Sequence, residues 1–244
     1  MLYLSHSLKK RRDYMKLAGM QKLTLLDFPS VVACVVFTKG CNFRCPFCHN
    51  ASLVCGSSSD SLSEDDIIDF LRRRQGILEG VVITGGEPLL HSDIPEFIKR
   101  IKAEGYLVKL DTNGTNPELL EALIKDALVD YVAMDIKNSP SEYAKATGDI
   151  PLDMEKIERS KNLLLSGVVD YEFRTTVVKG IHTEESMKEL FEWISGAEKY
   201  YLQQFKPATD LIDPRGLSEF SPKELQSFCE TAGAYVKYAQ IRGI

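Results

Sequence analysis

The sequence lacks three features that would place it in other protein classes. No apolar run approaches the roughly 18 residues that a membrane-spanning helix needs. The basic residues near the start are not followed by an apolar segment, so the pattern of a secretory signal is missing. With 30 basic and 35 acidic residues the formal net charge is -5, which gives no basic excess for nucleic acid or a membrane surface. We therefore expect a cytoplasmic protein that binds neither nucleic acid nor membrane.

The chain is long enough for one sizeable domain, because 44% of its 244 residues are hydrophobic. Residues 1–14 are basic and show no alternation of apolar and polar residues. We expect them to form an N-terminal extension, disordered or helical, or to come from an upstream start codon, with Met15 or Met20 as the natural beginning. Residues 15–244 contain no linker-like or low-complexity segment and are predicted to form a single domain.

Apolar segments of strand length alternate with segments that carry helix signals. Ser63 and Asp66, Asn116 with Pro117, and Thr183 are typical of helix starts. This alternation predicts an α/β fold with a parallel sheet, either a partial (β/α)6 barrel or a doubly wound sheet. The predicted strands are 31–37, 80–84, 106–111, 131–136, 171–178 and 200–205, and the predicted helices include 63–74, 94–103, 153–165 and 222–233.

Polar and glycine residues follow five of these strands directly. In parallel α/β folds the chemistry gathers at the carboxyl ends of the strands, which meet along one rim. The sequence therefore predicts one site built from Lys39-Gly40-Cys41, Gly85-Gly86-Glu87-Pro88, Asp111-Thr112-Asn113-Gly114, Asp135-Ile136-Lys137 and His182.

Three of the six cysteines, Cys41, Cys45 and Cys48, form a C-x3-C-x2-C cluster. Three thiolates can hold three irons of a [4Fe–4S] cluster and leave the fourth iron open to a substrate. A closed zinc site is the alternative, but it needs a fourth ligand. His49 follows Cys48 directly, and adjacent side chains seldom reach one tetrahedral metal together. The spacing therefore favours the iron–sulfur cluster.

The other three cysteines are scattered. Cys34 lies in an apolar run and Cys229 in a predicted helix, so both are predicted to be core residues. Cys55 precedes a Gly/Ser-rich loop, where it is either a fourth ligand or a bystander. A flexible loop of this kind suits no rigid site, which favours the bystander.

The cysteine motif, with Phe47 before its last cysteine, and the sequence Gly85-Gly86-Glu87-Pro88 resemble radical S-adenosylmethionine (SAM) enzymes over about residues 15–206. Residues 23–29 and 37–50 are similar to the glycyl-radical-enzyme activating proteins, above all to that of anaerobic ribonucleoside-triphosphate reductase. Residues 111–114 and 135–137 are similar to pyruvate formate-lyase activating enzyme. Ser30 departs from the glycine common in the family, and an insert with extra cysteines is missing, so one cluster is expected.

The resemblance implies the cofactors and the residues that bind them. Cys41, Cys45 and Cys48 would hold the [4Fe–4S] cluster, whose open iron binds the amino and carboxylate groups of SAM. Gly85, Gly86 and Glu87 would bind the methionine amino group, although a lone Gly-Gly would indicate only a turn. Asp135 and Lys137 would line the SAM site, with a strand-end surface charge as the alternative for Lys137. Asp111 and Thr112 would hold a monovalent cation together with Asp135, or else cap a turn.

Further residues are expected around the cluster and SAM. Phe47 would shield the cluster from water or be plain core, and His49 would pack on the adenine. Arg174 lies mid-strand among apolar residues, so a carboxylate or cluster partner is expected. His182 would contact the ribose or adenosine, or simply precede the helix cap at Thr183. Gln203 or Gln204 would reach the adenine.

The implied activity is reductive cleavage of SAM to a 5′-deoxyadenosyl radical, which removes a hydrogen atom from a glycine of a partner glycyl radical enzyme. Anaerobic ribonucleotide reductase is the expected partner, and a flavodoxin or ferredoxin-type protein is the expected electron donor. A segment at 207–220 would help to form the mouth for the partner or be a plain surface connection. One alternative is a small-molecule enzyme like 7-carboxy-7-deazaguanine synthase. A metal-binding or interaction module without turnover is disfavoured, because it leaves Glu87 and Lys137 without a purpose.

Overall fold

The computed structural model describes residues 15, 17–56, 62–207 and 210–243. The predicted N-terminal extension lies outside the described residues, as does most of the Gly/Ser-rich loop after Cys55.

The fold is an α/β sheet of eight strands in the order of the sequence. β1 pairs antiparallel with β2, and every pair from β2 to β8 is parallel. β1 and β8 are the two ends of this strand order, so the sheet forms an open, partial barrel, as predicted. The strands are β1 (Leu17–Thr24), β2 (Ala33–Thr38), β3 (Gly80–Gly85), β4 (Leu107–Thr112), β5 (Tyr131–Asp135), β6 (Asp170–Val177), β7 (Tyr200–Gln204) and β8 (Ala239–Arg242).

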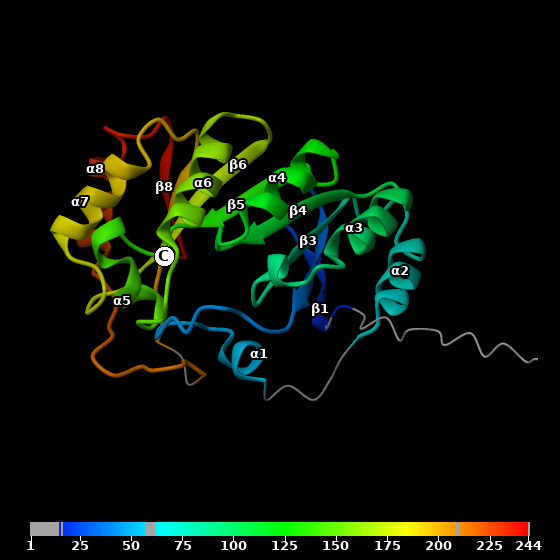
Figure 1. Cartoon of the computed structure of the whole chain (residues 1–244), viewed down its shortest axis with the longest axis horizontal. Coiled ribbons are helices and arrows are strands. Elements are labelled where there is room, and N and C mark those ends of the chain that lie inside the picture. Colours follow the sequence, from blue (N-terminus) through cyan, green and yellow to red (C-terminus); the bar gives the residue numbers. More distant parts are fainter. Residues whose placement is uncertain (1–14, 16, 57–61, 208–209, 244) are drawn as a thin grey trace, which may run out of the picture.

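Helices connect the parallel strands and cover the outer face of the sheet (Figure 1). The expected caps are present: Ser63 and Thr183 form capping boxes, and the Asn116 side chain accepts the N–H of Leu119. Within the described residues, no helix is both long and apolar enough to cross a membrane. The helices are α1 (Ala51–Cys55), α2 (Glu64–Arg72), α3 (Ile94–Ala103), α4 (Pro117–Lys125), α5 (Tyr143–Thr147), α6 (Met154–Leu165), α7 (Glu184–Trp193) and α8 (Pro222–Ala232), with single 3-10 turns at Pro88–Leu90 and Pro140–Glu142.

The six predicted strands and the six helices that go with them are confirmed, whereas the sequence pattern misses β1 and β8. β1 is an edge strand with the exposed residues Gln21, Lys22 and Leu23 in its second half, so it has no continuous apolar run. β8 has only four residues, and Gln240 and Arg242 interrupt its apolar pattern. Both strands gain their stability from a paired neighbour rather than from their own sequence.

The sheet is buried on both faces, which explains the continuous apolar strands. The larger core lies between the sheet and the helices and includes Phe97 and Ile98 of α3. A smaller core fills the inside of the barrel at the amino ends of the strands and contains Phe28, Ala33, Val35, Val82 and Tyr131.

Truncation in the larger core is predicted to cost much of the stability. Ile98 is fully buried in α3, so Ile98→Ala should lower the free energy of unfolding by about 2–5 kcal/mol through lost burial and a residual cavity. Leu90→Ala is the control, because Leu90 is 49% exposed and should change stability by less than about 0.5 kcal/mol. Urea denaturation of both variants measures the difference, and equal losses would contradict this description of the core.

Candidate active site

The three clustered cysteines lie in the loop between β2 and α1 and line one cleft at the carboxyl ends of the strands. The N–H of Cys48 donates to the carbonyl of Cys45, and that of Gly40 to Leu53 of α1, which shapes the loop. Burial raises the pKa of the Cys41 thiol to about 11 and that of Cys45 to about 12. In this environment the free thiols stay neutral, so only a bound metal would make thiolates of them.

The cysteines are not arranged around a single ion. Among the described residues, no group of three Cys, His, Asp or Glu side chains is placed to hold one metal ion. Each thiolate of an iron–sulfur cluster bonds a different iron, so its three ligands stand farther apart than those of one zinc ion. Cys34 is buried and Cys229 packs against the core, whereas Cys55 is exposed at the end of α1. This donor set fits a cluster better than a closed zinc site.

The glycine pair after β3 packs directly on the cysteine loop. The N–H of Gly86 donates to the carbonyl of Thr38, and the N–H of Glu87 to that of Gly40. A Cβ atom on Gly86 would lie 1.8 Å from the Gly40 carbonyl oxygen. Gly85 has φ +112°, a conformation that side chains other than glycine rarely adopt. Both glycines are therefore required by backbone contacts, whatever ligand they bind.

Glu87 joins the glycine loop to the end of β4. Its buried carboxylate accepts hydrogen bonds from the hydroxyl of Thr112 at 2.7 Å, the N–H of Asn113 at 2.7 Å and the N–H of Leu89 at 3.1 Å. Burial raises its pKa to about 7 in spite of these donors. The acceptor capacity of the side chain is largely used by the protein itself, so its clearest role is to position the two loops.

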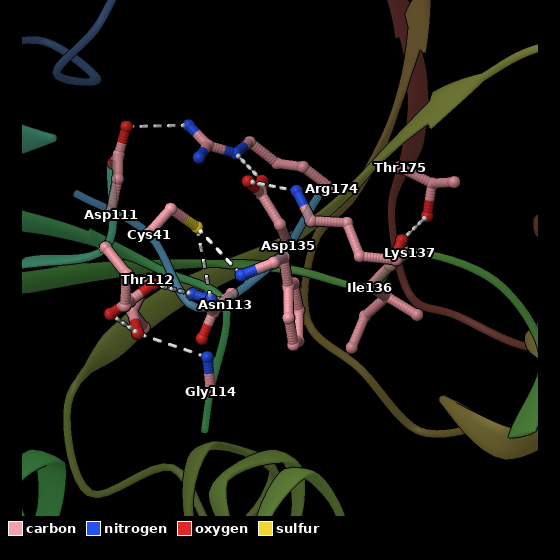
Figure 2. Close-up of polar contacts among 12 residues, drawn as sticks. Cys41, Asp111, Thr112, Asn113, Gly114, Asp135, Ile136, Lys137, Arg174 and Thr175 are labelled. Carbon is pink, nitrogen blue, oxygen red and sulfur yellow. Dashed lines mark hydrogen bonds and ion pairs between the residues drawn. The ribbon is translucent and has the colours of Figure 1, made fainter. Parts of the chain in front are cut away.

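Charged side chains of three neighbouring strands meet in the cleft (Figure 2). Arg174 on β6 donates to Asp135 at 2.9 Å and to Asp111 at 3.1 Å, so the predicted carboxylate partner is present. Lys137 contacts Asp135 at 3.0 Å, and the buried Lys109 contacts Asp111 at 2.5 Å. Burial alone would raise the pKa of Asp135, but Arg174 and Lys137 hold it at about 2. Arg174 and Lys137 thus compensate the charges of Asp111 and Asp135 in the cleft, with the buried Lys109 as a further partner of Asp111.

The aromatic and histidine residues divide between the cleft and the wall behind it. Phe47 and His49 line the cleft. His182 is not among the lining residues; its ring lies 6.3 Å from that of Phe47. Its Nδ1 accepts the N–H of Val178, so Nε2 carries the proton and donates to the Lys137 carbonyl at 2.9 Å. Burial lowers the pKa of His182 to about 4, so the ring is neutral.

Sequence reasoning does not foresee some contacts of the site. Asn113 lines the cleft, and its amide donates to Asn42 at 2.8 Å and approaches the Cys41 sulfur at 4.0 Å (Figure 2). It belongs to one of the polar strand ends, yet nothing in its residue type indicates this contact. Lys109 lies within a predicted strand and carries no motif, although the alternation of side chains along β4 places it on the same face as Asp111.

The end of the chain also contributes to the cleft. Gln203 lines it, whereas Gln204 points to the other face of β7 and donates to the Phe220 carbonyl. The segment after β7 reaches the cysteine loop, because the N–H of Asp213 donates to the carbonyl of Pro46. The predicted segment at 207–220 is therefore next to the cleft, with residues 208–209 outside the described part.

Comparisons with known proteins find related sequences and related structures. Residues 35–194 match the family model described as "Radical SAM superfamily". A protein of Methanocaldococcus jannaschii, provisionally named a glycyl-radical enzyme activating enzyme, is 34% identical over 237 residues, which cover 93% of this chain and 95% of the relative. The 7-carboxy-7-deazaguanine synthase of Halobacterium salinarum is 34% identical over 128 residues, which cover 51% of this chain and 46% of that enzyme.

Two solved structures share the fold. A domain of pyruvate-formate lyase-activating enzyme from Bacteroides vulgatus has a TM-score of 0.55 and 21% identity, and the match covers 68% of this chain and 99% of the domain. Streptococcus suis SuiB bound to S-adenosylmethionine has a TM-score of 0.66 and 15% identity, with 84% of this chain and 48% of SuiB covered. Since the family match spans more than half of the chain and one similarity extends over almost all of it, this protein is an enzyme of the radical SAM superfamily.

Proposed function

We propose that this enzyme cleaves SAM reductively to a 5′-deoxyadenosyl radical that takes a hydrogen atom from a glycine of a partner glycyl radical enzyme. One observation supports this proposal above all: the three clustered cysteines line the same cleft as a charged network. The network consists of Asp111, Asp135 and Arg174. The M. jannaschii protein that is provisionally named an activating enzyme matches nearly the whole chain, which supports the activase role over other radical SAM reactions.

The three cysteines would hold one [4Fe–4S] cluster, and the neighbouring loops would hold SAM. When bound, the cluster and SAM supply the electron and the radical chemistry, while the chain supplies orientation and a sheltered cavity. The cationic groups beside Asp135, Lys137 and Arg174, suit the methionine carboxylate, which Lys137 would face. Phe47, His49 and Gln203 would contact the adenosine, and His182 would hold the Lys137 backbone in place.

A monovalent cation beside Asp111, Thr112 and Asp135 stays a prediction. Arg174 already lies between the two carboxylates, so a cation there would have to compete with the guanidinium. The test is to measure the affinity for SAM in potassium and in a larger organic cation. Tighter binding in potassium would support the cation site, and equal binding would argue against it.

We also propose a partner, an electron donor and a location for this enzyme. The partner would be anaerobic ribonucleoside-triphosphate reductase, the electron donor a flavodoxin or ferredoxin-type protein, and the location the cytoplasm. Residues 15–244 would act as one domain. The segment from Asp210 onward, which contacts the cysteine loop at Pro46, would form part of the mouth that admits the glycine loop of the partner.

A second candidate function is radical chemistry on a small molecule. The similarity to 7-carboxy-7-deazaguanine synthase favours it, although that match covers only about half of each chain. Such an enzyme would cleave SAM in the same cleft but would leave no radical on a protein.

The decisive measurement is electron paramagnetic resonance of the reconstituted enzyme with SAM, a reductant and an anaerobic ribonucleotide reductase. We expect a stable glycyl radical doublet, because the abstracted hydrogen comes from a backbone Cα. SAM cleavage without a doublet on this or any other glycyl radical enzyme would instead support the small-molecule alternative.

The cluster ligands are tested by paired cysteine variants. Cys45→Ala should abolish the iron–sulfur absorbance and SAM cleavage, because two thiolates cannot hold the cluster firmly. Cys55→Ala should retain both, since Cys55 is exposed and outside the cleft. Retained cleavage in Cys45→Ala would overturn the proposed chemistry, and loss in Cys55→Ala would make Cys55 a ligand.

The contact between the two loops is tested by glycine variants. Gly86→Ala should lower SAM affinity and destabilise the fold by about 1–3 kcal/mol, because its Cβ meets the Gly40 backbone. Gly19→Ala is the matched control, since the φ of Gly19 is not positive and an added Cβ would meet no atom within 4 Å. Calorimetric SAM titration and thermal melting compare the two, and equal behaviour would argue against the loop contact.

A further inference from the structure

A buried carboxylate lies below the charged cleft inside the barrel. Glu172 is fully buried on β6, two residues before Arg174, and alternation along the strand places both side chains on the inner face. The hydroxyl of Tyr131 donates to its Oε2 at 3.1 Å. A carboxylate in this position destabilises the folded protein unless a cation compensates its charge.

Arg242 of the last strand supplies that charge. Its guanidinium donates to both oxygens of Glu172, at 2.8 Å and 2.9 Å. The guanidinium also lies 3.3 Å from the ring centroid of Tyr201, which stands on β7 between the two partners. The planar fork of an arginine satisfies both contacts at once, and a lysine could not do so.

A second cation competes for the same carboxylate. Arg174 is the neighbour of Glu172 along the inner face, and Glu172 contributes to the raised pKa of Arg174. In the structure Arg174 instead turns toward the cleft, where it joins Asp111 and Asp135. Glu172 therefore acts electrostatically on Arg174 while the guanidinium is paired in the cleft.

We propose that Arg242 is a positioning residue for the SAM site, which pairs with Glu172 and thereby leaves Arg174 to Asp111 and Asp135. This inference depends on the proposed function, because it takes the cleft to be the SAM site. Without Arg242, the uncompensated Glu172 draws Arg174 deeper into the barrel. Asp135 then loses its nearest guanidinium contact, and the cleft loses positive charge that attracts the methionine carboxylate.

A double-variant experiment tests whether Arg174 and Arg242 compete for Glu172. The full chain is reconstituted with iron and sulfide without oxygen, and the dissociation constant of SAM is measured by calorimetry for Arg242→Gln, Glu172→Gln and the two combined. Arg242→Gln should weaken SAM binding by about tenfold or more, as expected for a disturbed buried charge pair. Glu172→Gln, alone or combined with Arg242→Gln, should bind SAM within about threefold of the unchanged protein, because a neutral amide no longer attracts Arg174.

Controls separate positioning from a general loss of structure. Arg159→Gln removes an exposed arginine that pairs with Glu118 on the surface, and it should bind SAM normally. Cluster absorbance and the melting temperature are recorded for every variant. Should Arg242→Gln not fold, Arg242→Met carries the same test, because it keeps an unbranched side chain without the charge, and adding Glu172→Gln must then improve its SAM affinity.

The outcomes decide between a positioning role and a purely structural role for Arg242. Rescue of SAM affinity by Glu172→Gln supports the positioning role where the melting temperature shows that Arg242→Gln is folded, because the second change would also relieve a purely structural loss caused by the unpaired carboxylate. Unchanged affinity in Arg242→Gln, or a double variant as weak as the single one, overturns it. If the unchanged protein holds a cluster but does not bind SAM, the proposed function itself fails, and the positioning role fails with it.

Discussion

The parallel pairing of β2 to β8 is the constraint on which the rest of this structure depends. Each crossover returns the chain to the same side of the sheet, so the carboxyl ends of the strands meet along one rim. The cysteine loop, the glycine loop and the polar ends of β4, β5 and β6 are far apart in sequence and still form one cleft. The outer helices add the buried area that holds this arrangement together.

The rim carries charges that would be unstable alone in a partly buried cleft. Asp111 and Asp135 are stabilised as anions by Arg174, Lys109 and Lys137, and the two carboxylates in turn stabilise these cations. Such a network is preorganised, because each member has at least one fixed partner. Under the proposed function, it would therefore meet the amino acid group of SAM with little rearrangement.

The two loops of the site are joined to one another through the backbone. Gly86 packs on Gly40, and Glu87 accepts hydrogen bonds from Thr112 at the end of β4 and from Asn113 after it. The cysteine loop, the glycine loop and Asn113 are thus joined by direct contacts. This coupling explains why Gly86 and Glu87 matter for the geometry of the site even apart from any contact with SAM.

The sequence predicts much of this protein because its signals are local. Alternating apolar runs and helix caps predict six strands and their helices, and the spacing of Cys41, Cys45 and Cys48 predicts an open cluster. The marginal strands β1 and β8 escape prediction, since their stability comes from paired neighbours. By itself, then, the sequence determined the parallel α/β class with its six central strands, the cysteine motif and the set of polar strand ends, because each depends on residues close together in the chain. Only the tertiary structure decided which side chains meet. It directed Glu87 toward Thr112 and Asn113, placed His182 behind the cleft rather than along it, and paired Glu172 with Arg242. Partners separated by 25 to 70 residues are chosen by the register and curvature of the sheet, and no local pattern encodes either.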